Sequence, residues 1–257
     1  ADDSQIITSN TVWSGSVSVG SNVTIASGAS LTISDNADVN VTQDVIIVVE
    51  GTLVIESSSN SIPHIYGSYR YPTSNRPVWQ GIHVVSGGSL IVGNVLIEYA
   101  RGAFDIEGSA TIQSNSAPMV DHVQIGWYIN GGSLSIGENS SLNCNDASSS
   151  CLSLKSSSVT VPEVNSSSSS SIVMVDGSST IIAENLIGNT IGVGVQIFSG
   201  SSVVMNRIVL HDAGVGISQT GAASVNIESV LFSGMNRVGV DWSGASGAQI
   251  SNLSVSP

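Results

Sequence analysis

Positive charge is scarce in this sequence of 257 residues. Six Lys and Arg side chains stand against 19 Asp and Glu, which gives a formal net charge of −13. This balance disfavours a nucleic-acid partner, because binding to a phosphate backbone requires clustered Lys and Arg. The sequence also lacks an apolar run of about 18 residues, so we expect no membrane-spanning segment in it. With 41% hydrophobic residues it is too apolar for a disordered Ser/Gly linker, and we expect a folded chain.

Cysteine is also rare, because the sequence contains only Cys144 and Cys151. Two cysteines so close in sequence are typical of a small disulfide loop formed in an oxidising compartment. The alternative is a pair of buried thiols, and a metal site is disfavoured because no His or third Cys lies nearby. The chain opens at Ala1 with neither an initiator Met nor an apolar targeting segment. That opening is expected after removal of a secretory signal, and equally in a trimmed chain.

Small polar residues are abundant instead, with 51 Ser and 27 Gly. Five N-x-Ser/Thr sequons are candidates for glycosylation if the chain is exported. Together with the scarcity of Lys and the expected disulfide, these features predict a secreted or cell-surface protein. The five sequons are at Asn22, Asn40, Asn139, Asn165 and Asn252.

A repeat of about 22 residues is the strongest pattern in the sequence. Each unit begins with a turn of small residues followed by a short apolar strand. A pair of alternating apolar residues follows about two-thirds of the way through the unit. The turns recur at Ser89, Ser109, Ser133, Ser157, Ser179, Ser202, Ser224 and Ser246. The apolar pairs are Ile82/Val84, Phe104/Ile106, Trp127/Ile129, Leu152/Leu154, Val173/Val175, Val195/Ile197, Val215/Ile217 and Val238/Val240.

Three short alternating strands per unit cannot bury their apolar faces alone. Stacking each strand on its counterpart one repeat later pairs the backbone in parallel sheets and lines the interior with Val, Ile and Leu. The predicted fold class is therefore all-β, a parallel β-helix with three short strands in each rung of about 22 residues. The alternatives fit less well. Leucine-rich repeats need a Leu/Asn framework, a propeller blade needs about 40 residues, and helical repeats need a period of 3.6.

Several units carry a family resemblance. They include residues 200–205 (GSSVVM), 206–210 (NRIVL) and 214–217 (GVGI), and near the start residues 12–19, 23–33 and 49–53. These segments resemble the right-handed parallel β-helix family, the pectate-lyase-like superfamily in its broad sense, in its secreted or cell-surface type. The resemblance spans roughly residues 12–257 and implies a right-handed solenoid. It leaves function open, because the family includes lyases, hydrolases, adhesins and structural surface proteins.

One continuous domain is expected. Residues 1–60 depart from the 22-residue register and are predicted to form the first strands and a cap, and residues 61–257 the regular rungs. Two segments interrupt the rungs, a loop insertion at 66–79 and a Ser-rich excursion at 165–171. We expect the Ser-rich excursion to be flexible and solvated.

The loop insertion supplies the candidate contact residues. Aromatic side chains beside Arg stack on sugar rings or contact a partner chain. Alternatively, the loop folds back over the first rungs and its tryptophan enters the core. The candidates are Tyr66, Tyr69, Arg70, Tyr71, Arg76 and Trp79.

A polysaccharide-cleaving enzyme on this scaffold requires carboxylates stacked on neighbouring rungs, either to hold calcium or to act as an acid/base pair. With Leu186, Ile208 and Val230 in equivalent positions, Arg207 falls diagonally between two glutamates, which indicates surface charge pairing. We therefore predict no catalytic residue, and an enzyme is disfavoured.

The histidines, at positions 64, 83, 122 and 211, lie in separate units without metal-ligand spacing, so no metal site is predicted. We predict that His83 points outward beside Asp105 in a structural pairing. No cofactor is predicted, although acidic turns such as residues 35–38 leave calcium open. The predicted outward column reads His83, Asp105, Tyr128, Ser153, Met174, Gln196, Gly216 and Gly239.

The function expected from these features is a non-enzymatic secreted or cell-surface β-helix with a structural or adhesive role. Its expected partners are further copies of itself, assembled end to end or laterally into a fibre, sheath or surface layer, or surface glycans. The alternative is a carbohydrate-binding or polysaccharide-cleaving β-helix.

Overall fold

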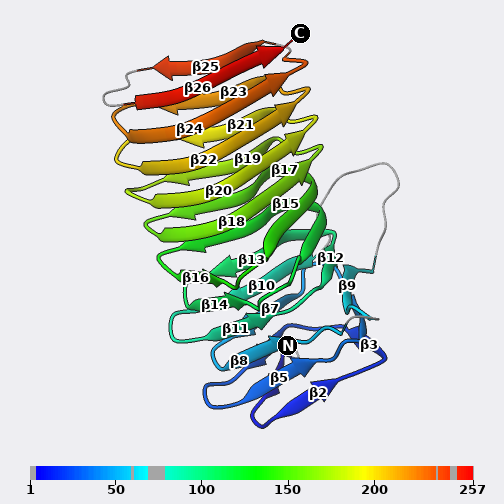
Figure 1. The fold of residues 1–257 in the computed structure, drawn as a ribbon. Helices are drawn as coiled ribbons and strands as arrows, with labels where there is room; N and C mark the ends of the chain where they lie inside the picture. Colours follow the sequence, from blue (N-terminus) through cyan, green and yellow to red (C-terminus); the bar gives the residue numbers. More distant parts are fainter. Residues whose placement is uncertain (1–3, 59–60, 69–78, 236, 244–247, 257) are drawn as a thin grey trace.

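The computed structural model describes residues 4–58, 61–68, 79–235, 237–243 and 248–256. They form 26 β-strands that pair in parallel and stack as successive coils of a right-handed parallel β-helix. Figure 1 shows the coils rising from β2 and β5 at one end to β25 and β26 at the other. The predicted fold class is therefore confirmed. Among the described residues there is no helix of a length and hydropathy that would cross a membrane.

Each coil contributes to three parallel sheets, which we number in the order in which the chain passes through them. Sheet 1 holds eleven strands or parts of strands within the described residues. They are β1 (Gln5–Ile7), β4 (Val23–Ile25), β7 (Ile46–Val49), β10 (Trp79–Val84), β13 (Ala100–Ile106), the second parts of β15 (Met119–Asn130) and β17 (Ser141–Lys155), β19 (Ser171–Asp176), β21 (Val193–Ile197), β23 (Val215–Thr220) and β25 (Val238–Ser243).

Sheet 2 follows sheet 1 in every coil. Its strands are β2 (Thr11–Trp13), β5 (Ser30–Ile33), β8 (Thr52–Ile55), β11 (Ser89–Val92), β14 (Ser109–Ile112), β16 (Ser133–Ile136), and the first parts of β18 (Ser158–Ser167), β20 (Thr180–Asn189), β22 (Ser202–His211), β24 (Ser224–Ser233) and β26 (Ala248–Ser256).

Sheet 3 closes each coil. It consists of β3 (Ser16–Val19), β6 (Asp38–Val41), β9 (His64–Gly67), β12 (Leu96–Glu98), the first parts of β15 and β17, and the second parts of β18, β20, β22, β24 and β26.

Alternation along the strands builds the core, because successive side chains of a strand point to opposite faces. In β5 and β8 every second residue is buried, and the same holds in most coils. The interior is a continuous column of Val, Ile and Leu, widened in the middle by Phe104 and Trp127. These two rings are fully buried and stack with centroids 4.0 Å apart.

The corner between sheets 3 and 1 turns on a single residue in the left-handed region. The φ angle is +59° at Tyr99, +51° at His122 and +51° at Asp146, and the column continues through four more coils. A one-residue turn leaves the last outward side chain of sheet 3 and the corner side chain close together. Sequence-adjacent polar residues therefore converge at this corner, which matters below.

The outward column of sheet 1 follows the predicted order from His83 as far as Gln196. It then continues with Ser218 and Asp241, so the prediction of Gly216 and Gly239 was wrong. The pairing keeps a constant offset of 22 residues here, because Val195 pairs with Ile217 and Ile197 with Gln219. Gln219 is fully buried at an inward position, so the apolar pattern that predicted Val215/Ile217 as the inward pair was two residues early.

Residues 5–55 form the strands of the first coils and pair in parallel with later strands. One other segment differs from expectation. The Ser-rich run does not leave the solenoid, because Ser166 and Ser167 pair in register with the coils on both sides. Ser166, Ser169 and Ser171 are buried, and the Ser166 hydroxyl donates to the Ser169 oxygen at 2.8 Å. Mutual hydrogen bonds let small hydroxyls fill core positions here.

Candidate functional site

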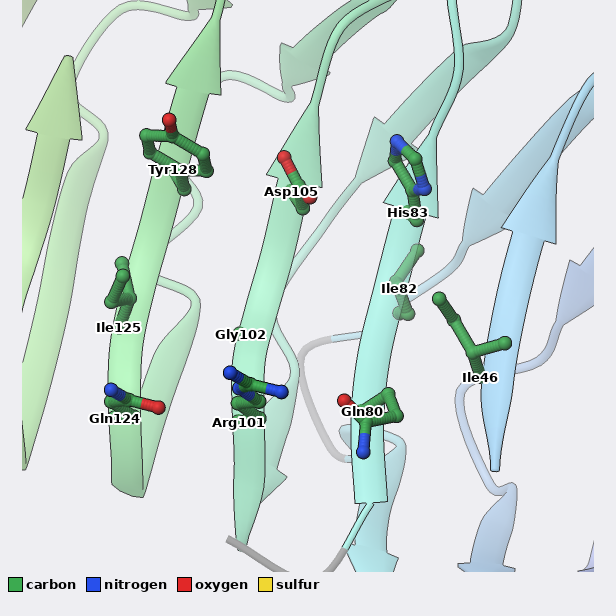
Figure 2. A pocket seen from close by; sticks show the side chains of 10 residues that line it. All are labelled: Ile46, Gln80, Ile82, His83, Arg101, Gly102, Asp105, Gln124, Ile125 and Tyr128. Carbon is green, nitrogen blue, oxygen red and sulfur yellow. The ribbon is translucent and has the colours of Figure 1, made fainter. Parts of the chain in front are cut away.

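A hollow with mixed chemistry lies on the outer face of sheet 1, over β7, β10, β13 and β15. Its volume is about 310 Å³, near the lower end for small-molecule sites. Figure 2 shows two rows of polar side chains with an apolar floor between them. The lining residues are Ile46, Gln80, Ile82, His83, Arg101, Gly102, Asp105, Gln124, Ile125 and Tyr128. We call this hollow the sheet 1 groove.

Strand register creates the two rows. Trp79 pairs with Ala100 and Gly81 with Gly102, which places Gln80 beside Arg101, and Gln124 follows on the next coil. The second row is the outward column His83, Asp105 and Tyr128. Neighbouring strands lie about 4.8 Å apart. Polar groups therefore repeat along the groove at a spacing near the length of one sugar ring.

Two irregularities hollow the floor of the groove. The register shifts between Gly81 and Ile82 against β13, and again between Val123 and Ile125 against β17. Such bulges bend a strand and redirect its side chains. Gly81 sits at φ +103°, and a Cβ there would overlap the Gly102 carbonyl oxygen. At Gly102 a Cβ would meet nothing within 4 Å, so the missing side chain is part of the open volume.

Electrostatics in the upper row centre on Asp105. Burial raises the pKa of this carboxyl above its usual range; His83 opposes the shift, and Glu107 adds to it. The Asp105 Oδ1 and His83 Nε2 atoms are buried and make no hydrogen bond within the described structure. His83 Nε2 lies 3.8 Å from Glu107 Oε2. These two buried polar atoms are unsatisfied within the described structure, and a ligand in the groove reaches them only if the two side chains rotate.

Tyr128 and Arg101 complete the set. Burial, followed by the negative charge of Asp105, raises the pKa of the Tyr128 phenol, which therefore stays protonated and able to donate. The exposed Arg101 guanidinium has no hydrogen-bond or ion-pair partner within the described part of the chain. The groove thus offers an aromatic ring, two amides, a carboxyl, an imidazole and a guanidinium.

The residues predicted from the loop insertion lie elsewhere. Tyr69, Arg70, Tyr71 and Arg76 fall outside the described residues. Tyr66 stands outward on sheet 3, stacked on His64 with ring centroids 4.5 Å apart. Trp79 is fully buried, and its Nε1 donates to the Glu98 carbonyl oxygen at 3.0 Å. The prediction of Trp79 as a contact residue was therefore wrong, and the alternative of a core tryptophan is correct for it.

The expected disulfide is present between Cys144 and Cys151, with Cα atoms 5.6 Å apart and both residues buried. The loop that the disulfide closes contains Asp146, a residue at the corner between sheets 3 and 1. Of the sequons, Asn22, Asn139 and Asn252 are exposed, while Asn40 and Asn165 are partly buried. The Asn165 amide donates to Asn143 and to Glu163. Glycosylation at these five positions stays a prediction.

The register around Arg207 is confirmed, since this residue pairs with Asn185 and Ser229. The surface charge pairing expected there is not formed: all ion pairs among the described residues involve histidine. Long side chains at an exposed corner gain little from pairing, because solvent screens the attraction and ordering them costs entropy.

A second polar cluster lies on the outer face of sheet 3 and at its corner with sheet 1. Ligand atoms of Glu98, Asp121 and His122 all lie within 4.8 Å of one another. His64 adjoins them, with Nε2 2.6 Å from Glu98 Oε2. The prediction of no metal site was drawn from the histidines alone, which lie in separate units. Glu98 and Asp121 are register partners on neighbouring coils, and His122 directly follows Asp121. His64 and Glu98 are 34 residues apart, with the loop insertion between them.

Comparisons with known proteins give no assignment. No protein-family model matches the chain, and neither the curated proteins nor the solved structures contain a significant match.

Proposed function

We propose that this chain is a glycan-binding β-helix with an adhesive role, and that the sheet 1 groove holds a short segment of a neutral glycan. The observation that carries the proposal is the pairing of an open, glycine-floored groove with two rows of hydrogen-bonding side chains. Sugars are bound by such sets, in which amides and carboxyls take the hydroxyl groups and an aromatic ring packs against the pyranose face. Successive parallel strands present hydrogen-bonding side chains at regular intervals along the solenoid. A polysaccharide likewise presents its sugar rings at regular intervals.

The charge of the chain selects between glycan classes. A net charge of −13 repels a polyanion over several ångströms. One guanidinium in the groove, at Arg101, offsets little of that repulsion. A neutral glycan avoids it and still uses Arg101 as a multiple donor.

The proposed setting is the cell surface or the extracellular medium. A disulfide within β17 supports an oxidising compartment, and the exposed sequons fit an exported chain. Membership of the pectate-lyase-like superfamily in its secreted type belongs to the same proposal, supported by the coil architecture. Assembly into a fibre or layer stays a prediction; light scattering over a concentration series tests it.

A second candidate function is cleavage of the bound glycan. The raised pKa of Asp105 favours it, because a carboxyl that stays protonated can act as a general acid. Hydrolysis would also need a second carboxylate across the scissile bond, and Glu107, whose charge acts on Asp105, is a candidate. An assay for new reducing ends with the bound glycan decides between binding and cleavage.

The test fills the groove without touching its polar groups. In Gly102→Val the new side chain enters open space, and the φ of Gly102 lies outside the left-handed region. The matched control is Gly20→Val, since Gly20 also has nothing within 4 Å of an added Cβ. A glycan array first identifies a neutral ligand, and calorimetry then measures its affinity. We expect at least a tenfold loss in Gly102→Val and none in Gly20→Val.

Two results would contradict the proposal. The first is an array on which the protein binds no glycan, or only polyanionic ones. The second is equal affinity in Gly102→Val and the wild type, with both folded by circular dichroism. Tyr128→Ala supplies an independent check, because loss of ring stacking should weaken binding by about 1 kcal/mol or more.

A further inference from the structure

We propose that Glu98, Asp121 and His122 form a binding site for one divalent transition-metal ion, with Zn²⁺ as the probe that tests it. This site, the corner cluster, lies on β12 and β15 where sheet 3 turns into sheet 1. The inference is independent of the proposed glycan function.

The donor set consists of groups that Zn²⁺ accepts. His nitrogen and Asp or Glu oxygen are both zinc ligands, and three protein ligands leave a fourth position for water, although this set has one more carboxylate and one fewer His than the commonest sets. Three atoms within 4.8 Å of one another fit in a circle whose radius is 4.8 Å divided by √3, so an ion at its centre lies at most about 2.8 Å from each. Bound distances are about 2.1 Å. Small side-chain rotations close the difference.

One ring nitrogen of His122 lacks a hydrogen-bond partner among the described residues. His122 Nδ1 is buried and makes no hydrogen bond within the described structure. It nevertheless lies 2.9 Å from Asp121 Oδ1. A ring nitrogen and a carboxylate oxygen that approach without hydrogen-bond geometry point toward a shared position, and a cation there satisfies both.

Each ligand is held by a second residue, as in built metal sites. For His122, the other ring nitrogen, Nε2, faces Asp146 Oδ2 at 3.6 Å, and the ring stacks on Tyr99. A metal-bound histidine commonly directs its second N–H to a carboxylate, which fixes the ring and strengthens the ligand.

The two carboxylates are held in the same way. His64 Nε2 lies 2.6 Å from Glu98 Oε2, and its Nδ1 is 3.5 Å from Asp38 Oδ1. On the next coil, Asn145 Nδ2 donates to Asp121 Oδ1 at 2.9 Å, and Ser167 in turn donates to Asn145 at 2.7 Å. Glu98 and Asp121 are only 14% and 19% exposed. Such burial sets the corner cluster apart from a solvated acidic patch.

A bound ion would also stabilise the solenoid. Its ligands come from two successive coils, and the supporting residues from the coils on either side. A bound ion would therefore clamp neighbouring coils together and raise the unfolding midpoint as metal concentration rises. Imidazole is a poor ligand for Ca²⁺, which takes oxygen donors, so Ca²⁺ should compete weakly.

The experiment uses the full chain after chelator treatment. Zn²⁺ is titrated by calorimetry in competition with a chelator, and elemental analysis gives the stoichiometry. The test variants are His122→Asn, which keeps a residue tolerated at φ +51°, and Glu98→Gln. The control is His211→Asn: His211 is also on sheet 3 beside an aspartate, but its Nδ1 is hydrogen-bonded to the Ser233 hydroxyl.

We expect one Zn²⁺ per chain, at least a hundredfold weaker binding in both test variants, and wild-type affinity in His211→Asn. Asp146→Asn should weaken binding by about 10- to 100-fold. The proposal is overturned if Zn²⁺ binding is unchanged in folded His122→Asn and Glu98→Gln, or if several weak sites appear that no single variant removes. It is also overturned if Ca²⁺ binds as tightly as Zn²⁺. Should His122→Asn fail to fold, Glu98→Gln alone decides.

Discussion

Reduction of the Cys144–Cys151 disulfide should lower the free energy of unfolding without dismantling the fold. The bridge closes a loop with a sequence separation of 7. For a loop of that size, the chain-entropy relation gives a loss of about 2.4 kcal/mol at about 25 °C. Both cysteines are buried; after reduction the two sulfur atoms must move apart to van der Waals distance, and any crowding that results adds to this loss.

The measurement is urea unfolding with and without a reductant, followed by circular dichroism and tryptophan fluorescence. With a urea m-value near 3 kcal/mol/M, the midpoint should fall by about 0.8 M. The unfolding transitions reported by the two probes must coincide, because a solenoid can unfold in parts. The double variant Cys144→Ala/Cys151→Ala should lose about 1–2 kcal/mol more than reduction does, since it also leaves cavities.

A midpoint shift below about 0.2 M on reduction would refute this reasoning. So would two titratable thiols in the native, non-reduced protein. Either result would mean that the bridge does not constrain the unfolded chain.

Two further predictions concern the groove. Gly81→Ala places a Cβ onto the Gly102 carbonyl oxygen at φ +103° and should cost about 3–5 kcal/mol or prevent folding; Gly87→Ala, at φ +88° with open space around it, should cost only about 1 kcal/mol in the same urea titration. Asp105→Asn should remove a pH dependence. Burial raises the folded pKa of Asp105, so the folded state binds its proton more tightly, and wild-type stability falls as pH rises from the unfolded value of about 3.9 through the folded one. Thermal unfolding should therefore show the variant more stable at neutral pH and no such difference near pH 3; an advantage that grows toward low pH would contradict the sign.

The candidate sites were only partly predictable. His83, Asp105 and Tyr128 share a column that alternation and the repeat predict correctly, but Gln80, Arg101 and Gln124 were missed as a row. Their alignment depends on the bulge between Gly81 and Ile82, and a bulge adds one residue without any mark in the apolar pattern. A polar residue two or three positions before each apolar pair was the available signal.

The corner cluster was missed for another reason. Its two carboxylates, Glu98 and Asp121, pair across β12 and β15, so the repeat itself places them together. His122 joins them through a one-residue left-handed turn, for which a non-glycine residue gives no sequence signal. The supporting contact of His64 was hidden, because residue 64 pairs with residue 96 and not with one about 22 residues later.

Local patterns in the sequence are enough to predict an all-β solenoid, most of its inward positions and the outward direction of His83. These features follow from a period of two along each strand and a period of about 22 along the chain. The closeness of the two cysteines in the sequence predicts their disulfide. The sequence patterns do not predict which outward side chains meet. That choice depends on bulges, corner conformations and one long insertion, each of which changes the stacking of coils by a few residues and so changes every neighbour across the sheet.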